Sequence, residues 1–286
     1  MRSLPHLVTP AWLAAHQQEP DLRIVDVRWK LGDPGAGRRA YEAGHLPGAA
    51  FLELDRDLAA PRAAGPGRHP LPRAEDFART MERIGVGNTT RVVAYDAAGG
   101  ADAARLWFLL RYFGHETGAV LDGGVQAWQA AGGPLTREVP ALAAPPGGFH
   151  ARPRPELVVD RSRVAALARD ARALVLDARA PGRYRGQHEP IDPRAGHIPG
   201  ARNAPFLENL ATAAGPFLAP ETLRARYDTL GASKATEIVC YCGSGVTACH
   251  DLLALALLGR ENARLYEGSW SDWSFHPEAA LATGDE

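Results

Sequence analysis

The chain has 286 residues, 45% of them hydrophobic, and its 32 basic and 33 acidic residues give a formal net charge of -1 at pH 7. Because one hydrophobic core rarely grows beyond about 250 residues, this length predicts two domains, and the apolar content is sufficient for two cores. The balanced charge argues against nucleic acid or an anionic membrane surface as a partner.

The N-terminal residues lack the pattern of an export signal. Pro5 and Pro10 interrupt the apolar run that a signal peptide needs, and no uninterrupted apolar run reaches membrane-spanning length. We therefore expect a cytoplasmic protein that has no membrane partner.

The first half of the chain alternates short β-branched runs with longer helical patterns. IVDVR at 24–28 and VVAYD at 92–96 predict strands, and the helical pattern that follows over 101–114 ends at Gly114, a residue able to close the last turn with a positive φ. This alternation is typical of βαβ units. We expect an α/β fold with a parallel sheet flanked by helices on both faces.

The second half repeats the series of the first. The matched pairs of segments, in the same order, are IVDVR and LVLDAR, YEAGHLPGA and RAGHIPGA, VVAYD and IVCYC, and LDGGVQAW and YEGSWSDW. Four matches at a nearly constant offset predict a duplicated fold. The stretch between the halves is rich in proline and glycine, so we place domains at 1–140 and 157–286 with a linker at 141–156.

Residues that both halves share are expected to serve the fold. Asp26 and Arg28 match Asp177 and Arg179, and each GH(L/I)PGA turn carries one histidine, His45 or His197. Since buried charges and polar groups need partners, we interpret the first set as buried ion pairs and the histidines as hydrogen-bonded turn residues.

The two halves differ at the residue that ends the third matched segment. This residue is Cys242 in the second half and Asp96 in the first, and Cys242 opens a loop that leads directly into an apolar helix. Loop amides and the helix dipole at this position favour an anionic sulfur, and the thiolate is the reactive form of cysteine. The amides expected to converge on the sulfur are those of Gly243, Ser244, Gly245, Val246 and Thr247.

The three cysteines fall within ten positions, which suits neither a disulfide framework nor a structural zinc site. Cys240 precedes Cys242 in a β-branched run, so core packing is expected for it, and Cys249 lies on the following helix, where packing and a redox role both stay open. The alternative for Cys242 itself is a small buried hydrophobic residue.

The segments CGSGVTA at 242–248, EGSWSDW at 267–273 and the duplicated GH(L/I)PGA resemble the tandem-domain rhodanese sulfurtransferases, particularly the 3-mercaptopyruvate sulfurtransferases. The resemblance spans nearly the whole chain. It implies two rhodanese-like domains, a catalytic cysteine in the second one only, and a site between them. It also implies sulfur transfer through a persulfide on Cys242, with no metal or organic cofactor.

Further site residues are implied by the same resemblance. Arg183 resembles the arginine that holds the donor's carboxylate, a task that suits a planar guanidinium. Ser244, His69 and Asp55 resemble a set that manages protons during pyruvate release. The family's second carboxylate-binding arginine follows an EP pair, whereas this chain reads EPIDPRAGH, in which Arg194 is the nearest candidate.

Several functions stay open at this point. Gly243 and Ser244 stand where thiosulfate-using relatives typically carry basic residues, which favours 3-mercaptopyruvate as donor and keeps thiosulfate as the alternative. The acceptor is cyanide, a small thiol or thioredoxin. A non-enzymatic persulfide-carrying module is a further alternative, while a phosphatase would need an arginine at the position of Ala248.

Overall fold

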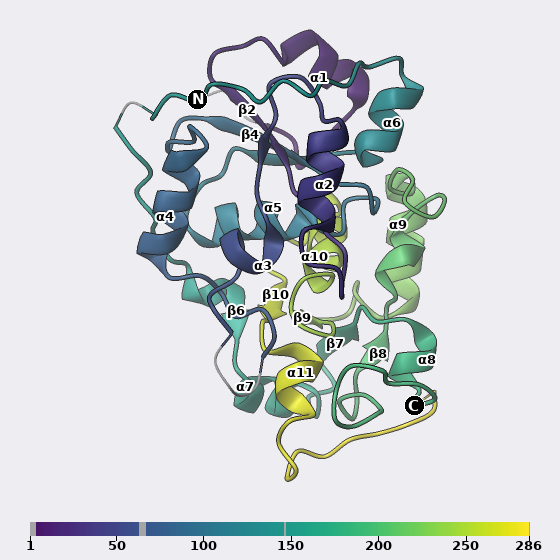
Figure 1. Ribbon diagram of the computed structural model, residues 1–286. Coiled ribbons are helices and arrows are strands. Elements are labelled where there is room, and N and C mark those ends of the chain that lie inside the picture. The colour runs from purple at the N-terminus through teal and green to yellow at the C-terminus, as the bar shows by residue number, and fades with distance from the viewer. Residues whose placement is uncertain (1–3, 63–66, 146, 286) are drawn as a thin grey trace. The chain divides into compact units, whose positions relative to one another are not determined.

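The computed structural model describes residues 4–62, 67–145 and 147–285 (Figure 1). The chain forms two compact units. Unit 1 comprises Met1–Ala60, Leu71–Arg154 and Leu210–Phe217, and unit 2 comprises Pro61–Pro70, Pro155–Asn209 and Leu218–Glu286. The short segment that contains His69 therefore belongs to unit 2, although it lies in the first half of the sequence.

Unit 1 alternates strands and helices, as its sequence predicts. Its elements are β1 (Leu7–Val8), α1 (Pro10–His16), β2 (Leu22–Asp26), α2 (Ala36–Ala43), β3 (Ala50–Phe51), α3 (Leu54–Asp57), α4 (Ala74–Arg83), β4 (Arg91–Tyr95), α5 (Ala103–Tyr112), β5 (Gly118–Leu121) and α6 (Gly124–Ala130).

The sheet of unit 1 is parallel, with strand order β1-β5-β4-β2-β3. In the register of the two central strands, Asp26 at the end of β2 lies beside Tyr95 at the end of β4. A residue that directly follows a parallel strand is positioned by the sheet, and its side chain can still contact a ligand. Binding sites of parallel α/β folds therefore lie at the carboxyl ends of the strands. Asp96 occupies such a position.

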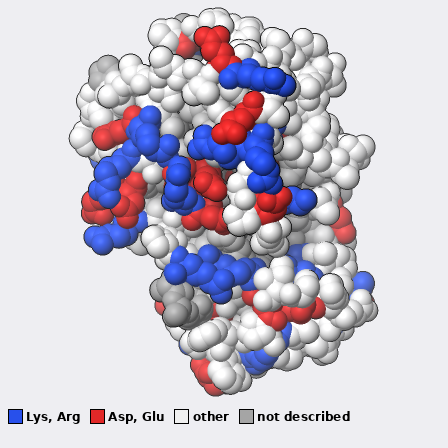
Figure 2. Space-filling model, viewed as in Figure 1, with Lys and Arg blue, Asp and Glu red and all other residues white. Residues whose placement is uncertain are grey.

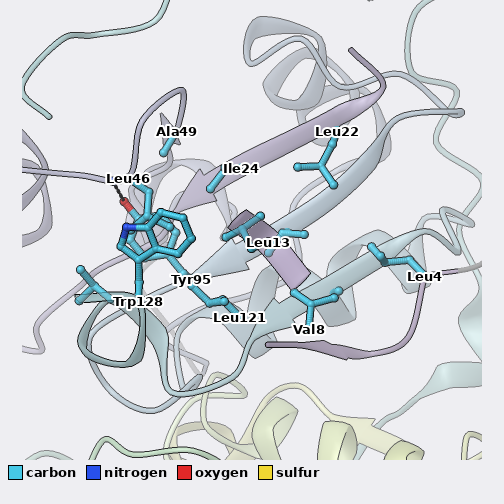
Figure 3. Packing of buried hydrophobic residues seen from close by; sticks show 13 residues of the cluster. Leu4, Val8, Leu13, Leu22, Ile24, Leu46, Ala49, Tyr95, Leu121 and Trp128 are labelled. Carbon is cyan, nitrogen blue, oxygen red and sulfur yellow. Dashed lines mark hydrogen bonds between the residues drawn. The ribbon is translucent and has the colours of Figure 1, made fainter. Parts of the chain in front are cut away.

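The core of unit 1 is packed from the sheet and the helices α1 and α6, together with the turn at Leu46 and Ala49 (Figure 3). Leu13 and Trp128 are nearly inaccessible to solvent within it. Tyr95 lies in this cluster and its hydroxyl accepts a hydrogen bond from the Leu46 amide at 3.1 Å, drawn as the dashed line in Figure 3. A buried tyrosine thus fastens the GHLPGA turn to the sheet.

Unit 2 has a matching series of elements. They are the 3-10 helix η1 (Pro155–Leu157), β6 (Val158–Val159), α7 (Arg161–Leu167), β7 (Ala173–Asp177), α8 (Pro181–Tyr184), β8 (Arg202–Asn203), the 3-10 helix η2 (Phe206–Asn209), α9 (Pro220–Thr229), β9 (Glu237–Tyr241), α10 (Ala248–Leu257), β10 (Arg264–Tyr266) and α11 (Ser269–Trp273).

The second sheet repeats the first one strand for strand. Its order is β6-β10-β9-β7-β8, all neighbours are parallel, and Asp177 pairs with Tyr241 as Asp26 does with Tyr95. Its core includes Val175, Ile198 and Trp270. The prediction of a duplicated parallel α/β fold is confirmed.

The residues shared by both halves have the structural roles expected of them. Arg28 and Asp26 form an ion pair at 2.6 Å, and Arg179 and Asp177 form the same pair at the same distance. Nδ1 of His45 lies 2.8 Å from the Tyr41 carbonyl, and the matching distance in unit 2, from His197 to the Tyr184 carbonyl, is 2.9 Å. Both interpretations, buried ion pairs and hydrogen-bonded turn histidines, are confirmed.

Basic and acidic side chains are interspersed over much of the face shown in Figure 2. Ion pairs join some of the charged side chains of the chain, as in the contact of Arg83 with Asp57 at 2.6 Å. Among the described residues, no helix combines the length and the apolar character that crossing a membrane requires.

Candidate active site

Cys242 directly follows strand β9 and begins the loop that ends at helix α10. The loop turns back on itself, so that the amides of Ser244 and Gly245 lie 3.4 Å and 3.1 Å from Sγ of Cys242. Gly245 takes a φ of 79°, a conformation that glycine adopts without strain. The sulfur, whose residue is 2% exposed, is therefore held by backbone donors that stabilise negative charge.

The expected convergence of five amides on this sulfur is only partly right. Within the described chain, the amides of Gly243, Val246 and Thr247 form no hydrogen bond to Sγ. Val246 and Thr247 lie at the start of α10, and their carbonyls accept hydrogen bonds from Cys249 and His250.

The equivalent loop of unit 1 shows what such a loop binds. The carboxylate of Asp96, which is fully buried, accepts four backbone hydrogen bonds of 2.7–2.9 Å. Two of these come from Asp102 and Ala103 at the start of α5, so the carboxylate also caps this helix. The loop after the central strand thus binds an anion, and in unit 1 this anion is the chain's own side chain at position 96. The donating amides belong to Ala98, Gly100, Asp102 and Ala103.

The segment EGSWSDW supports the cysteine loop from one side. The Trp270 amide donates to the Cys242 carbonyl at 2.9 Å, as the Val125 amide does to the Asp96 carbonyl in unit 1. The hydroxyl of Ser269 adds a hydrogen bond from the Cys242 amide at 3.1 Å.

Ser269 holds this place in a left-handed conformation, with a φ of 54°. Unit 1 has Gly124 here with a φ of 58°, so the second copy accepts a strained backbone where it gains a hydroxyl beside the cysteine. Sequence reasoning missed Ser269, although the alignment of GG at 123–124 with GS at 268–269 carried the signal.

Ser244 and His69 are brought together as predicted, although 175 positions separate them. Nδ1 of His69 lies 2.7 Å from Oγ of Ser244, and both residues are buried. A serine hydroxyl paired with an imidazole, close to a cysteine sulfur, can pass a proton in either direction.

Asp55, the third member of the predicted proton-handling set, lies in unit 1 on the short helix α3. Its carboxylate accepts a hydrogen bond of 2.8 Å from the indole of Trp29 in the same unit. Its part in catalysis stays a prediction.

Arg183 lies beside the cysteine loop, on helix α8. A Cβ placed on Gly243 would stand 3.3 Å and 3.6 Å from its two terminal nitrogens, so the guanidinium covers the residue that follows Cys242. Arg183 pairs with Glu189 at 2.7 Å and with Asp192 at 3.1 Å. The alternative to a site residue was a solvated arginine on the surface. The side chain of Arg183 is instead held by two carboxylates.

The two carboxylates respond differently to burial. For Glu189, burial acts to raise the pKa, but the hydrogen bonds and charge of Arg183 outweigh it and leave the pKa below its ordinary value. For Asp192, burial dominates and raises the pKa despite the opposing charge of Arg68.

Arg194 is the predicted second donor-binding arginine. Its guanidinium donates to five backbone carbonyls at the end of α11 and in the segment after it, with distances from 2.6 Å to 3.4 Å. These bonds tie Arg194 to the C-terminal segment, and its assignment to the substrate stays a prediction. The five carbonyls are those of Trp273, Ser274, His276, Pro277 and Ala279.

A different arginine, Arg68, lies next to the loop. A Cβ on Gly243 would lie 2.7 Å from Nη2 of Arg68. Sequence reasoning missed Arg68 because nothing in the chain pattern links residue 68 with residue 243.

The other two cysteines are fully buried beneath the loop. Cys249 donates from Sγ to the Gly245 carbonyl at 3.3 Å, and burial raises the pKa of Cys240 well above its ordinary value. Cys240 is therefore a residue of the packed core, and a redox role for Cys249 stays a prediction.

Helix α10 also carries Asp251, a fully buried carboxyl group. Its Oδ1 accepts hydrogen bonds from Asn209 at 2.7 Å and from the Tyr227 hydroxyl at 3.1 Å, while Oδ2 has no partner among the described residues. Burial raises the pKa of Asp251 to about 7.

We expect Asp251 to make the protein less stable as the pH rises. Its folded-state pKa of about 7 exceeds the unfolded value of about 3.9, so the stability it contributes is complete below pH 4 and is lost by about pH 7. The loss is on the order of 4 kcal/mol, because each pKa unit corresponds to about 1.4 kcal/mol. Urea unfolding of the wild type and of Asp251→Asn at several pH values tests this. The wild type should lose stability relative to the variant between pH 4 and 7, and parallel curves would contradict the expectation.

The sequence model of the rhodanese-like domain family matches the chain twice, at residues 9–131 and 160–276. A Pseudomonas aeruginosa protein named "Probable 3-mercaptopyruvate sulfurtransferase" is 46% identical over 286 residues, or 99% of this chain and 100% of that protein. The thiosulfate sulfurtransferase of Bos taurus is 35% identical and covers 97% of this chain and 95% of its own. The crystal structure of SseA from Escherichia coli, described with the mechanism of 3-mercaptopyruvate sulfotransferases, has a TM-score of 0.81 at 35% identity and covers 93% of this chain and 99% of its own.

Two parallel α/β domains, a cysteine in the anion-binding loop of the second, and these matches together define the class. The chain belongs to the rhodanese family and contains two rhodanese-like domains. It is a sulfurtransferase, an enzyme that moves a sulfur atom from a donor to an acceptor.

Proposed function

We propose that the enzyme takes sulfur from 3-mercaptopyruvate, carries it as a persulfide on Cys242 and passes it to a thiophilic acceptor. The observation that carries this proposal is the difference between the two loops. The loop of unit 1 binds the carboxylate of Asp96 through four amides, and the loop of unit 2 offers its amides to a sulfur.

The comparison of the loops also supports a persulfide rather than a thiolate alone. A carboxylate oxygen of aspartate is two bonds away from Cβ, and so is the outer sulfur of a cysteine persulfide. In unit 1, the oxygens at this distance reach amides as far along as the start of the following helix. By their position at the helix start, Asp102 and Ala103 correspond to Thr247 and Ala248, and the outer sulfur on Cys242 would extend toward the amides of these two residues.

In the first step, the Cys242 thiolate attacks the sulfur of 3-mercaptopyruvate. An S–S bond forms and the carbon–sulfur bond breaks, so that its electron pair leaves on carbon as the enolate of pyruvate. The proton of the transferred SH group is lost from the new persulfide, and the enolate gains one proton. Ser244, hydrogen-bonded to His69, is placed to deliver that proton.

In the second step, the acceptor attacks the outer sulfur. The S–S bond breaks and its electron pair returns to Sγ, which restores the thiolate that the loop amides stabilise. With cyanide the product is thiocyanate. A small thiol or reduced thioredoxin would react in the same way, and each is an acceptor consistent with the proposal.

The choice of donor is supported by the residues beside the sulfur. Gly243 and Ser244 bring no positive charge, so thiosulfate, a dianion, gains little there, whereas the carboxylate of 3-mercaptopyruvate suits the guanidinium of Arg183. Of the relatives described above, one is named for 3-mercaptopyruvate and another for thiosulfate.

Sulfur transfer to cyanide, measured with each donor in turn, tests the proposal. We expect kcat/KM for 3-mercaptopyruvate to exceed that for thiosulfate at least about tenfold, with Cys242→Ser as the blank. A preference for thiosulfate would be consistent with the persulfide mechanism but would refute 3-mercaptopyruvate as the preferred donor. Loading of one sulfur per chain without turnover would instead indicate a persulfide-carrying module.

The proposal places the enzyme in the cytoplasm. Its three cysteines, all among the described residues, form no disulfide, which suits a compartment that keeps thiols reduced.

A further inference from the structure

Two arginines, not one, lie against the residue that follows Cys242. Arg68 and Arg183 approach the same point, because a Cβ added to Gly243 would meet nitrogens of both side chains within 3.6 Å. Arg68 reaches this point from the segment that belongs to unit 2, and Arg183 from helix α8. A side chain at position 243 would therefore crowd both guanidinium groups.

Arg68 is anchored to the structure that supports the cysteine. Its backbone amide donates to the Ser271 hydroxyl at 3.1 Å, and the Ser271 amide in turn donates to the Gly243 carbonyl at 2.9 Å. The Arg68 side chain is only 12% exposed, and its Nε has no hydrogen-bond partner among the described residues. A buried guanidinium with an unused donor is suited to receive an anion.

A carboxylate of the protein already lies between the two arginines. Asp192 forms an ion pair through Oδ1 with Arg68 and through Oδ2 with Arg183, and its side chain is 4% exposed. Arg183 also pairs with Glu189. Asp192 and Glu189 thus offset the positive charge of Arg68 and Arg183, and Glu189 is shared with Arg179.

We propose that Arg68 and Arg183 together bind the anionic group of the sulfur donor, and that Asp192 between them selects a singly charged donor over a doubly charged one. The inference rests on the proposed function, since it describes how that site chooses among sulfur donors. In this proposal Arg68 is the second arginine that binds the donor.

The selection follows from charge. A donor with one carboxylate can share the guanidinium donors with Asp192, whereas thiosulfate brings a second negative charge close to that carboxylate. Each added unit of charge at a few ångströms in a partly buried site changes binding by about ten- to a hundredfold. Removing the charge of Asp192 should therefore help a dianion much more than a monoanion.

The test uses Asp192→Asn, which keeps the shape of the side chain and removes its charge. We expect the ratio of kcat/KM for thiosulfate to kcat/KM for 3-mercaptopyruvate to rise at least about tenfold. The matched control is Asp285→Asn, which changes the net charge of the protein equally at an exposed carboxylate paired with Arg185. The ratio should not change in this control.

A second variant examines Arg68 by itself. Arg68→Gln should raise KM for 3-mercaptopyruvate about tenfold or more while kcat changes much less, because binding and not chemistry is weakened. Arg68→Lys, which retains the charge, should restore part of the affinity. Circular dichroism and thermal unfolding of each variant establish that it is folded before kinetics are compared.

The outcomes separate this inference from the proposed function. If the wild type transfers sulfur from 3-mercaptopyruvate and the ratio in Asp192→Asn stays within about twofold, the selection by Asp192 is wrong and the proposed function stands. An unchanged KM in folded Arg68→Gln would refute the role of Arg68. If the wild type accepts sulfur from neither donor, the proposed function fails first.

Discussion

Cys242→Ser should abolish sulfur transfer, with a loss of kcat of at least about a thousandfold for either donor. The hydroxyl of serine is a far weaker nucleophile, and no stable analogue of the persulfide can form on it. The loop should survive the change, since serine is close to cysteine in size and the amides of Ser244 and Gly245 can donate to its oxygen. The measurement is thiocyanate formation, combined with intact mass after incubation with donor.

The neighbouring cysteine provides the control for this experiment. Cys249 lies on helix α10, directly after the same loop, and is fully buried, so a donor cannot reach its sulfur. Cys249→Ser should retain transfer to within about tenfold and should still gain the mass of one sulfur atom after incubation with donor. If Cys249→Ser lost the sulfur and Cys242→Ser kept it, the assignment of the persulfide to Cys242 would be wrong.

Asp96→Ala should destabilise unit 1 by about 3–5 kcal/mol. The carboxylate is fully buried and accepts four backbone hydrogen bonds, so its removal leaves a loop and the start of α5 with unpaired donors. Asp96→Asn should cost less, because one carbonyl oxygen still accepts while the amide nitrogen cannot. Chemical denaturation, followed by far-UV circular dichroism, measures both.

The control for Asp96 is an acidic residue on the surface of the same unit. Asp76 lies in the first turn of α4 with a side chain that is 46% exposed, and its replacement by alanine should leave the unfolding midpoint almost unchanged. Equal midpoints for the wild type and Asp96→Ala would mean that the loop does not depend on an anion. The argument from Asp96 to a persulfide would then lose its support.

The internal duplication explains why so much could be predicted from one sequence. Comparing the halves separated residues of the fold, such as Asp26 and Asp177, from the position that is Asp96 in the first half and Cys242 in the second. The same comparison placed the cysteine at the end of a central strand, where parallel sheets present their functional groups.

Short-range chemistry and periodicity were sufficient for these conclusions. A strand, a glycine-containing loop and an apolar helix are each encoded by neighbouring residues, so the sequence by itself determined the two α/β domains and the loop around Cys242. It also indicated that Ser244 and His69 belong together, through the resemblance of their motifs, and the 2.7 Å contact confirms this proximity.

The charges around the sulfur were decided by the tertiary structure alone. The segment with Arg68 joins unit 2, whereas Arg194 turns to five carbonyls of its own neighbourhood. Asp192 lies only two positions from Arg194, yet it pairs with both arginines beside Gly243. A long side chain can satisfy its donors in many directions, and which carboxylate or carbonyl it meets depends on how distant segments pack. No local pattern in the sequence carries that information.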